Sequence, residues 1–382
     1  MVPSSPPAAG ETLLVTGFPG FIGRRLVASL LEGDPSTRVV ALIESSARDS
    51  ARAAQAASAG GERLELLEGD ITRRDLGLHQ SARGRLAEEL TGAFHLAAVY
   101  DLSIPLEVAQ RVNVEGTGNL LELCARAQRL RRLTYVSTAY VAGVRTGVVY
   151  EHELALGQRF KNHYESTKFQ AELWVRDAMA HVPTTICRPA IVVGDSRTGE
   201  TQKFDGPYYL LRTISALRAR GWPVRGLGSP DAPFNVVPVD FVVRALTAAH
   251  REPAAEGQTL HLVDPEPLSA ADLVALLARL YAGVEVRGRL PAALMESALR
   301  SERVRGLLGG TPRESIRYLN HPVRFDTRRA RDVLGAQGIE PPRFGDYARE
   351  VVEYFRAHES DARLVPGAAG RTSTPSLAAR LG

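Results

Sequence analysis

The N-terminal part of the chain alternates short apolar runs with longer amphipathic stretches. The run at residues 12–16 (TLLVT) stops at a glycine-rich turn, and an amphipathic stretch at 21–31 follows it directly, which predicts a strand, a turn and a helix. Four further runs resemble buried strands and are separated by helical segments such as 105–128: RVVALI (38–43), RLELLEG (63–69), FHLAA (94–98) and LTYVST (133–138). This alternation predicts an α/β fold built on a doubly wound parallel sheet.

The rest of the chain is less regular. A helix is predicted at 162–181, and three apolar runs after it predict later strands of the same sheet: TTICRPAIVVG (184–194), FNVVPV (234–239) and QTLHLVD (258–264). Mixed helix and Pro/Gly-rich loops predict a smaller α+β substrate domain interleaved with this Rossmann sheet. We expect a dinucleotide-binding core at 11–194, a substrate-domain insertion at 195–233, a return to the sheet at 234–264, a C-terminal substrate segment at 265–358, and disorder at 1–10 and 366–382.

Composition excludes several classes of protein. The chain is 44% hydrophobic and 24% charged, as globular proteins are. No apolar stretch reaches the roughly 18 residues of a membrane-spanning helix, and the N-terminus lacks the pattern of a signal peptide, so we expect a cytoplasmic protein. The net charge of +4 is dispersed, which argues against a nucleic-acid partner. Cys124 and Cys187 lie in apolar segments and are interpreted as buried side chains without a redox or metal role; no metal site is expected.

Lysine is rare in this chain. Of the 47 Lys and Arg residues, the lysines are Lys161, Lys168 and Lys203. Arginine therefore stands almost everywhere that a generic positive charge would serve. We interpret a lysine here as a position where an ammonium group is specifically required.

The turn after the first predicted strand has the spacing of a phosphate-binding loop. It reads Gly17, Phe18, Pro19, Gly20, Phe21, Ile22, Gly23, a G-x-x-G-x-x-G pattern between a predicted strand and a predicted helix. Such glycines allow a tight turn and a close approach of the backbone to a pyrophosphate, and the helix N-terminus attracts its charge. We therefore predict a dinucleotide cofactor at this turn.

The end of the second strand bears on the choice of cofactor. Glu44 lies there, where a carboxylate accepts hydrogen bonds from the adenosine ribose, which favours NADH. Arg24, Arg25 or Arg48 could instead meet the 2′-phosphate of NADPH.

The end of the third strand is placed to border the adenine ring. Asp70 and Ile71 lie there, although Asp70 could instead cap a helix before Thr72.

Tyr164 and Lys168 are four residues apart in the helix predicted at 162–181, so both side chains leave the same face. A carbonyl that accepts hydride develops negative charge on oxygen, a phenol can supply the proton, and an ammonium group lowers the pKa of a neighbouring phenol. The lysine can also hold the nicotinamide ribose. An exposed surface pair on an amphipathic helix is the alternative.

A hydroxyl group at the end of the fifth strand would complete this site. Ser137 and Thr138 lie at the carboxyl edge, where ligands of open α/β sheets bind. Adjacent strand residues point to opposite faces, so spacing alone does not decide which of the two contacts the carbonyl oxygen.

Together these motifs resemble the extended short-chain dehydrogenase/reductase family over residues 12–265. The motifs are GFPGFIG, HLAA (95–98), NVEGT (113–117), VSTAYV (136–141), YESTK (164–168) and CRPAIVVG (187–194). The resemblance implies that Thr138 is the catalytic Ser/Thr, Tyr164 the proton donor and Lys168 the catalytic lysine. It also implies that Asn113 supports the lysine and a water, unless Asn113 is a plain helix cap. Further cofactor contacts are implied at Ala97, Ala98, Ser137, Arg188 and Pro189.

Three later segments narrow the resemblance. GDSRTGE (194–200), KFDGPYY (203–209) and NVVPVDFV (235–242) are similar to the fatty acyl and carrier-bound thioester reductases, the male sterility branch. That branch usually has an arginine near the end of the second strand and uses NADPH, whereas this chain has Glu44. The cofactor is therefore expected to be NAD(P)H, with Glu44 favouring NADH and the branch favouring NADPH.

The reaction that this branch implies is reduction of a long-chain acyl thioester, on coenzyme A or an acyl carrier protein, to an aldehyde or alcohol. No adenylation or carrier domain is recognised in the chain, so we expect the acyl donor to arrive in trans. Residues 287–308 are apolar on one side and basic on the other, and they either cover an acyl chain, with peripheral membrane contact conceivable, or pack on their own domain. The alternatives are a steroid, ketone or nucleotide-sugar dehydrogenase or epimerase on the same scaffold, and a catalytically idle dinucleotide-binding protein. The sequence does not indicate an oligomeric state.

Overall fold

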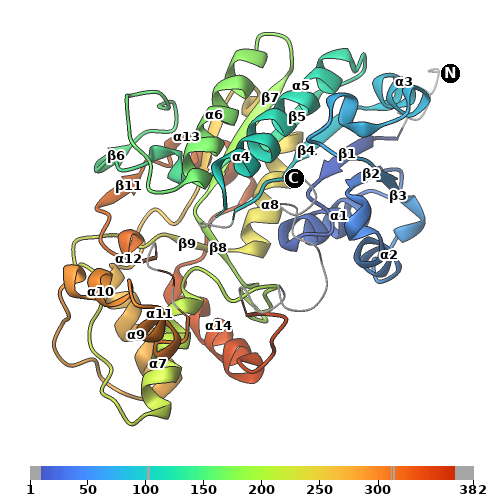
Figure 1. Ribbon diagram of the computed structural model, residues 1–382. Coiled ribbons are helices and arrows are strands. Elements are labelled where there is room, and N and C mark those ends of the chain that lie inside the picture. The colour runs from blue at the N-terminus through green and yellow to red at the C-terminus, as the bar shows by residue number, and fades with distance from the viewer. Residues whose placement is uncertain (1–9, 101–103, 311, 313–314, 366–382) are drawn as a thin grey trace.

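A parallel β-sheet forms the centre of the computed structural model, which describes residues 10–100, 104–310, 312 and 315–365 (Figure 1). Seven strands are arranged in the order β10-β7-β5-β4-β1-β2-β3, and each pairs in parallel with its neighbours. Their bounds are β1 Thr12–Thr16, β2 Arg38–Ile43, β3 Leu64–Glu68, β4 Gly92–His95, β5 Arg132–Val136, β7 Thr184–Pro189 and β10 Thr259–Leu262. The predicted doubly wound α/β fold is confirmed.

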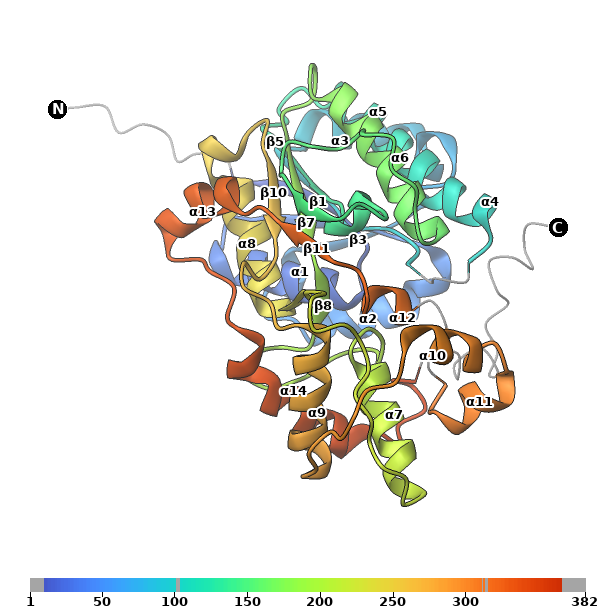
Figure 2. The same cartoon turned by 90° about the vertical axis from the view of Figure 1, so that its left-hand side faces the viewer.

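Helices cover both faces of this sheet, as Figure 2 shows. One apolar core joins the sheet to helices α1 (Phe21–Gly33), α2 (Arg48–Ala56), α8 (Val239–Arg251) and α13 (Arg328–Leu334). Another joins the opposite face to α3 (Gln80–Glu89), α5 (Gly116–Arg126) and α6 (His163–Ala178). Because both faces are buried, most positions in the central strands are buried and each strand contains an apolar run, and this is why such runs were sufficient to predict them.

The direction of strand order reverses between β1 and β4. The chain runs outward from β1 to β2 and β3, then returns to place β4 on the other side of β1. At such a switch point the connections leave in opposite directions and open a crevice at the carboxyl ends of the strands. The glycine-rich turn after β1 lies at this crevice.

One of the predicted later strands and the end of another do not belong to the main sheet. β8 (Ile191–Val193) and β9 (Val236–Pro238) pair with each other in a separate two-stranded sheet. The run 184–194 is divided because the main sheet ends beside Leu262: Ala190 N donates to the carbonyl of Leu262, and the next amide, of Ile191, donates to Asn235. A further small parallel pair, β6 (Gly147–Val149) with β11 (Val323–Phe325), had no signal in the sequence pattern.

The two cores on the faces of the sheet are together called the first core, and a second hydrophobic core lies beyond the carboxyl edge of the sheet. It is built mainly on α7 (Tyr208–Ala219), α9 (Ala270–Ala282) and α14 (Phe344–His358), which lie together on the lower side of Figure 2. The segments expected at 195–233 and 265–358 meet here. Within the second of them, however, β11 and α13 pack on the first core, so chain order and spatial grouping differ.

The amphipathic segment 287–308 is not one continuous helix. It forms α10 (Ala292–Ala298) and α11 (Glu302–Leu307), followed by α12 (Ser315–Tyr318). Met295, Leu299 and Leu308 pack on the second core, so this segment packs on its own domain. Within the described part of the chain, no helix is long and apolar enough to cross a membrane.

Arg188 has a structural position that differs from the cofactor contact that we expected. Its side chain is fully buried, and its guanidinium donates to Glu172 from Nε (3.0 Å to Oε2) and from a terminal nitrogen (2.6 Å to Oε1). The same guanidinium donates to the carbonyl of Glu153 at 2.8 Å. Burial raises the pKa of Glu172, but the charge and hydrogen bonds of Arg188, together with the charge of Arg176 and a hydrogen bond from Ser137, outweigh burial, so the pKa lies below its usual value. Arg188 therefore compensates a buried carboxylate and joins β7 to α6.

Removing this guanidinium should destabilise the fold strongly. Arg188→Met leaves Glu172 charged in the interior, with the partly exposed Arg176 (3.2 Å) as its remaining cationic partner. We expect the free energy of unfolding to fall by about 3 kcal/mol, near the lower end of the range for breaking a buried ion pair. The matched control is Arg131→Met, because the ion pair between Arg131 and Glu11 (2.9 Å) leaves Arg131 64% exposed. That control should cost at most about 1 kcal/mol. Denaturant unfolding measures both, and equal losses would contradict the role given to Arg188.

Candidate active site

One large cavity, of about 1350 Å³, lies at the carboxyl edge of the sheet between the two cores. It brings together most of the residues that the sequence singled out. Its lining includes Gly17, Phe18, Pro19, Gly20, Phe21, Ile22, Gly23, Glu44, Asp70, Ile71, Ala97, Ala98, Ser137, Thr138, Tyr164, Lys168 and Pro189. Arg48, Asn113 and Arg188 do not line it.

The glycine-rich turn brings β1 and β4 into backbone contact. Gly17 has a φ of +86°, and a Cβ atom there would lie 2.9 Å from the backbone of Leu96 and Ala97. Gly20 N donates to the carbonyl of Gly17 at 3.0 Å, and α1 begins at the next residue. The first turn of α1 therefore meets the cavity with unpaired backbone N–H groups, as a pyrophosphate requires. A dinucleotide fits this loop, and the cavity is large enough to hold a substrate as well.

The end of the cavity beside β2 and β3 matches the adenosine half of a dinucleotide. Glu44 lines it directly after β2, and Ile71 lines it after β3. The carboxylate of Asp70 accepts from Thr72 N (2.8 Å) and Oγ1 (2.7 Å), so it closes a turn; no helix begins at Thr72, in contrast to the capping alternative. Arg73, which the sequence did not single out, also lines this end.

The arginines considered for a 2′-phosphate are placed differently. The guanidinium of Arg48 pairs with the carboxylate of Glu68. That of Arg25 pairs with Glu200 at 3.1 Å, which links α1 to the loop between β8 and α7. Neither Arg25 nor Arg24 lines the cavity. Glu44 is thus the charged group of this set that faces the cavity.

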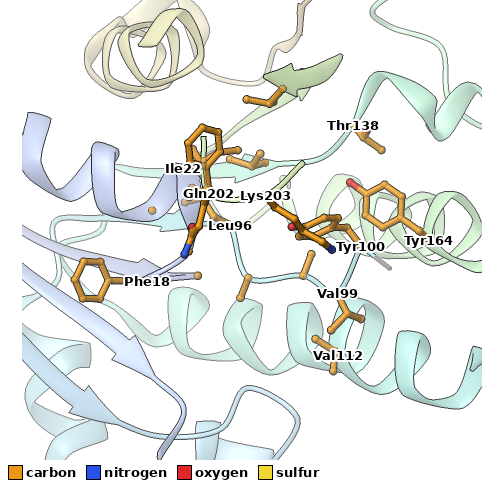
Figure 3. Close-up of a pocket in the computed structure, with 18 of the residues that line it drawn as sticks. Phe18, Ile22, Leu96, Val99, Tyr100, Val112, Thr138, Tyr164, Gln202 and Lys203 are labelled. Atoms are coloured by element: carbon orange, nitrogen blue, oxygen red, sulfur yellow. The ribbon is translucent and has the colours of Figure 1, made fainter. Parts of the chain in front are cut away.

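Tyr164 and Lys168 lie in the first turns of α6. Asn162 caps this helix by accepting from Glu165 N at 2.9 Å, which fixes where the helix begins. The hydroxyl of Tyr164 lies on the side of Thr138, as Figure 3 shows. Burial raises the pKa of Tyr164 to about 12, against the opposing effect of a hydrogen bond with Thr138. The phenol is therefore protonated at neutral pH and can act as a donor.

The ammonium group of Lys168 is held behind this phenol. Nζ donates to the carbonyl of Val136 at 2.8 Å and lies 4.4 Å from the ring centroid of Tyr135. The residue is 3% exposed. Burial lowers the pKa of Lys168 to about 7, although Glu172 opposes the shift. An anion that binds beside Lys168 would therefore raise its pKa and favour the charged ammonium form at neutral pH.

The structure distinguishes the two hydroxyl groups after β5. Ser137 Oγ donates to the carboxylate of Glu172 at 2.6 Å, away from Tyr164. Thr138 Oγ1 accepts from Tyr140 N at 3.3 Å and lies beside the phenol of Tyr164. Sequence spacing left this choice open, and the backbone geometry after β5 places Thr138 next to the phenol.

Asn113 lies behind the cavity wall, and its support of Lys168 through a water stays a prediction. It is fully buried in a π-helical turn, Gln110–Glu115, that precedes α5. Its amide accepts from Val99 N (2.8 Å) and donates to Val99 O (3.1 Å) and to Thr167 Oγ1 (3.0 Å). Among the described contacts, none joins Asn113 to Lys168. The amide instead ties the cavity wall after β4 to the residue that precedes the lysine.

Sequence reasoning missed the other side of the cavity. Tyr140 and Tyr318 line it with their rings edge to face (5.2 Å between centroids), and Tyr318 donates to Glu165 at 2.7 Å. Nothing local in the sequence marks Tyr318, because it reaches the cavity from 153 residues beyond Glu165. Lys203 and Asp205 also line the cavity; the scarcity of lysine had marked Lys203 as a specific requirement without assigning it to this site.

Comparisons with known proteins agree with this site. Residues 15–246 match the NAD-binding family described as male sterility protein. The chain is 27% identical over 281 residues to a carboxylic acid reductase of Segniliparus rugosus, covering 64% of this chain and 23% of that protein. It is 25% identical over 283 residues to a putative fatty acyl-CoA reductase of Drosophila melanogaster, covering 62% of this chain and 54% of the relative. The chain thus spans between about a quarter and about half of these relatives.

A solved structure matches nearly the whole chain. The terminal R domain from the myxalamid PKS-NRPS biosynthetic pathway superposes with a TM-score of 0.77 at 27% identity, covering 93% of this chain and 92% of that one. The family match, the Rossmann sheet and the Tyr164 and Lys168 pair at the cavity agree. The chain belongs to the male sterility family of extended short-chain dehydrogenases/reductases and is an NAD(P)-dependent oxidoreductase.

Proposed function

We propose that this protein reduces a long-chain acyl thioester, carried by coenzyme A or an acyl carrier protein, to the aldehyde. The observation that carries the proposal is the junction of Thr138, Tyr164 and Lys168 with the glycine-rich turn in one cavity. The similarity of this chain to a carboxylic acid reductase and to a putative fatty acyl-CoA reductase supports an acyl substrate.

The polar groups suit a carbonyl that becomes an oxyanion. Bound NAD(P)H would supply hydride to the carbonyl carbon. Thr138 and Tyr164 would donate hydrogen bonds to the carbonyl oxygen, and these strengthen as negative charge develops there. The resulting hemithioacetal would collapse as the C–S bond breaks, giving the aldehyde and a thiolate that takes up one proton. A second hydride would give the alcohol.

Lys168 would stabilise the negative charge on the carbonyl oxygen electrostatically. Its ammonium lies on the carbonyl of Val136, out of direct solvent, and would stabilise both the developing oxyanion and the ribose of the cofactor. A bound pyrophosphate and an oxyanion both favour the protonated lysine. We therefore infer that cofactor binding charges Lys168 before hydride transfer.

We further propose that NADH is the preferred cofactor. Glu44 lines the cavity where the adenosine ribose would lie, and a carboxylate there would accept from the ribose hydroxyls but repel a 2′-phosphate. The nearest arginine along the chain, Arg48, is held by Glu68.

Replacing the phenol tests the assigned reaction. Tyr164→Phe should lower kcat for decanoyl-CoA by roughly 10²–10⁴-fold, because the oxyanion loses its proton donor, while the Kd for NADH stays unchanged. The measurement is NADH or NADPH oxidation at saturating substrate, with 2-decanone as a ketone comparison. Tyr150→Phe is the matched control, since Tyr150 is 37% exposed and outside the cavity. Unchanged turnover in Tyr164→Phe would remove the assigned proton donor, and turnover of the ketone without any thioester would refute the proposed substrate.

Neutralising the carboxylate beside the ribose tests the cofactor preference. Glu44→Gln should shift the ratio of Kd values for NADPH and NADH toward NADPH by about tenfold, equivalent to about 1.4 kcal/mol. Glu62→Gln removes a similar charge from a side chain that is 77% exposed and outside the cavity, and should leave the ratio unchanged. Titration of each cofactor measures both ratios. A wild-type protein that binds NADPH more tightly, with no shift in the variant, would contradict the assignment.

The buried lysine should make stability depend on pH. The pKa of Lys168 is about 7 in the fold and about 10.5 in an unfolded chain, so the unfolded state binds more protons between these values and stability rises with pH across this window. Without cofactor, Lys168→Met should therefore be more stable than the wild type at pH 6.5, with a gap that narrows toward pH 10. Thermal unfolding of both proteins at each pH measures the gap, and a constant gap would show that the lysine is not desolvated.

A further inference from the structure

The loop between β8 and α7 reaches the cavity from the second core. Its residues Thr201 and Phe204 are buried, and Phe204 packs in the second core. The two residues between them, Gln202 and Lys203, line the cavity. The loop therefore brings two polar side chains from the second core to the crevice in which the cofactor binds.

This loop is fixed on both sides of Gln202. Arg25, in the second turn of α1, pairs with Glu200 at 3.1 Å, two residues before Gln202. Two residues after Gln202, the amide of Phe204 donates to the carbonyl of Leu364 at 2.7 Å. The side chain of Gln202 therefore starts from a backbone that is tied to the same helix whose first turn faces the cofactor.

Gln202 and Lys203 extend toward different parts of the cavity. Figure 3 shows the amide of Gln202 on the side of Ile22 and Leu96, and the ammonium of Lys203 on the side of Tyr100. Ile22 belongs to the first turn of α1, where the backbone N–H groups have no partner within the helix. The amide of Gln202 thus lies on the side of the cavity where the glycine-rich turn would hold a pyrophosphate.

The amide of Gln202 is available to a ligand. Within the described part of the chain, no hydrogen bond or ion pair involves this side chain, which is exposed where it lines the cavity. Other polar side chains of the same loop are paired: Ser196 Oγ donates to Asp240 at 2.9 Å, and Glu200 pairs with Arg25. Gln202 therefore retains an unused N–H donor beside the start of α1.

A bound pyrophosphate accepts hydrogen bonds on more than one side. The N-terminus of α1 approaches it from the first core, and the oxygens that face away from α1 need water or further donors. A hydrogen bond to an ionised phosphate is roughly twice as strong as one between neutral groups. The neutral amide of Gln202 offers such a donor from the second core.

We propose that Gln202 binds the pyrophosphate of the cofactor, its amide N–H donating to a phosphate oxygen. The bound dinucleotide then bridges the glycine-rich turn of the first core and a loop of the second core. Gln202 positions the cofactor and takes no part in proton or hydride transfer. Because Lys203 is the next residue, the same contact restrains the backbone from which Lys203 reaches the part of the cavity beside Tyr100. The inference depends on the NAD(P) site and not on which carbonyl compound is reduced.

Ligands that differ in the pyrophosphate test this contact. ADP-ribose retains the pyrophosphate without the nicotinamide, whereas adenosine lacks both. Gln202→Met keeps the length of the side chain and removes the donor, so the Kd values for NADH and ADP-ribose should each rise about tenfold, equivalent to about 1.4 kcal/mol. The Kd for adenosine should stay unchanged. Titration of NADH, and its displacement by the other two ligands, measures these values.

Two further variants sharpen the comparison. Gln202→Glu should weaken the binding of NADH and ADP-ribose more than Gln202→Met does, because a carboxylate repels the pyrophosphate. Gln128→Met is the matched control, since Gln128 is exposed in the loop after α5 and lies outside the cavity, and it should bind all three ligands as the wild type does. Without ligand, Gln202→Met should unfold at the wild-type temperature, because the side chain has no partner in the described part of the fold.

Hydrogen exchange gives a second readout that does not involve turnover. Saturating ADP-ribose should slow the exchange of backbone amides at 200–205 in the wild type, because the ligand then contacts this loop. In Gln202→Met, saturating ADP-ribose should protect these amides clearly less, while protection of the glycine-rich turn persists. Equal protection of the loop in both proteins would contradict the proposed contact.

Each other outcome has a defined meaning. Unchanged Kd values in Gln202→Met would refute the proposal, and weaker NADH binding with unchanged ADP-ribose binding would refute it by assigning Gln202 to the nicotinamide. A lower unfolding temperature without ligand, with adenosine binding weakened in proportion, would show that Gln202 is structural. A protein that passes these binding tests and reduces no thioester would retain this inference and lose the proposed substrate.

Discussion

The site depends on one buried carboxylate. Tyr164, Lys168 and Glu172 follow one another at four-residue intervals on α6, so they share one face of the helix. Glu172 is fully buried and is held by Arg188 from β7 and by Ser137 after β5. This charge fixes the rotation of α6 against the sheet. The charge of Glu172 also opposes the lowering of the pKa of Lys168 by burial. With the rotation of α6 fixed, Tyr164, one turn before Lys168, faces the cavity.

This constraint explains why the most conspicuous arginine of the sequence motif is not a ligand contact. Removing the guanidinium of Arg188 would leave a carboxylate buried without its main partner, which is costly. Because that carboxylate holds the guanidinium in the interior, Arg188 does not reach a cofactor in the cavity. The apolar run around Arg188 correctly indicated a central strand. What the run could not indicate is the partner, because Glu172 comes from another element.

The sequence was most informative where local physics determines the structure. The apolar runs identified the strands of the main sheet, since strands covered on both faces are mostly apolar. The glycine spacing identified the turn after β1, because a side chain at Gly17 would collide with the backbone that follows β4. Contacts between distant segments were not accessible: the division of 184–194 between two sheets, the split of 287–308 into short helices, and the approach of Tyr318 to α6 each depend on packing across the fold. Which of Ser137 and Thr138 lies beside Tyr164 depends on the backbone geometry after β5, and residue spacing alone does not determine that geometry.

The two walls of the cavity differ in how firmly they are tied to the rest of the fold. Asn113 forms hydrogen bonds with both backbone groups of Val99 and with Thr167, so the wall after β4 is anchored to α6. The opposite wall is assembled from the loop carrying Lys203 and from Tyr318, which arrive from separate parts of the chain. Substitutions on the anchored wall disturb chemistry and substrate choice together. New substrate preferences can therefore arise by remodelling the opposite wall, while the reaction itself is inherited unchanged.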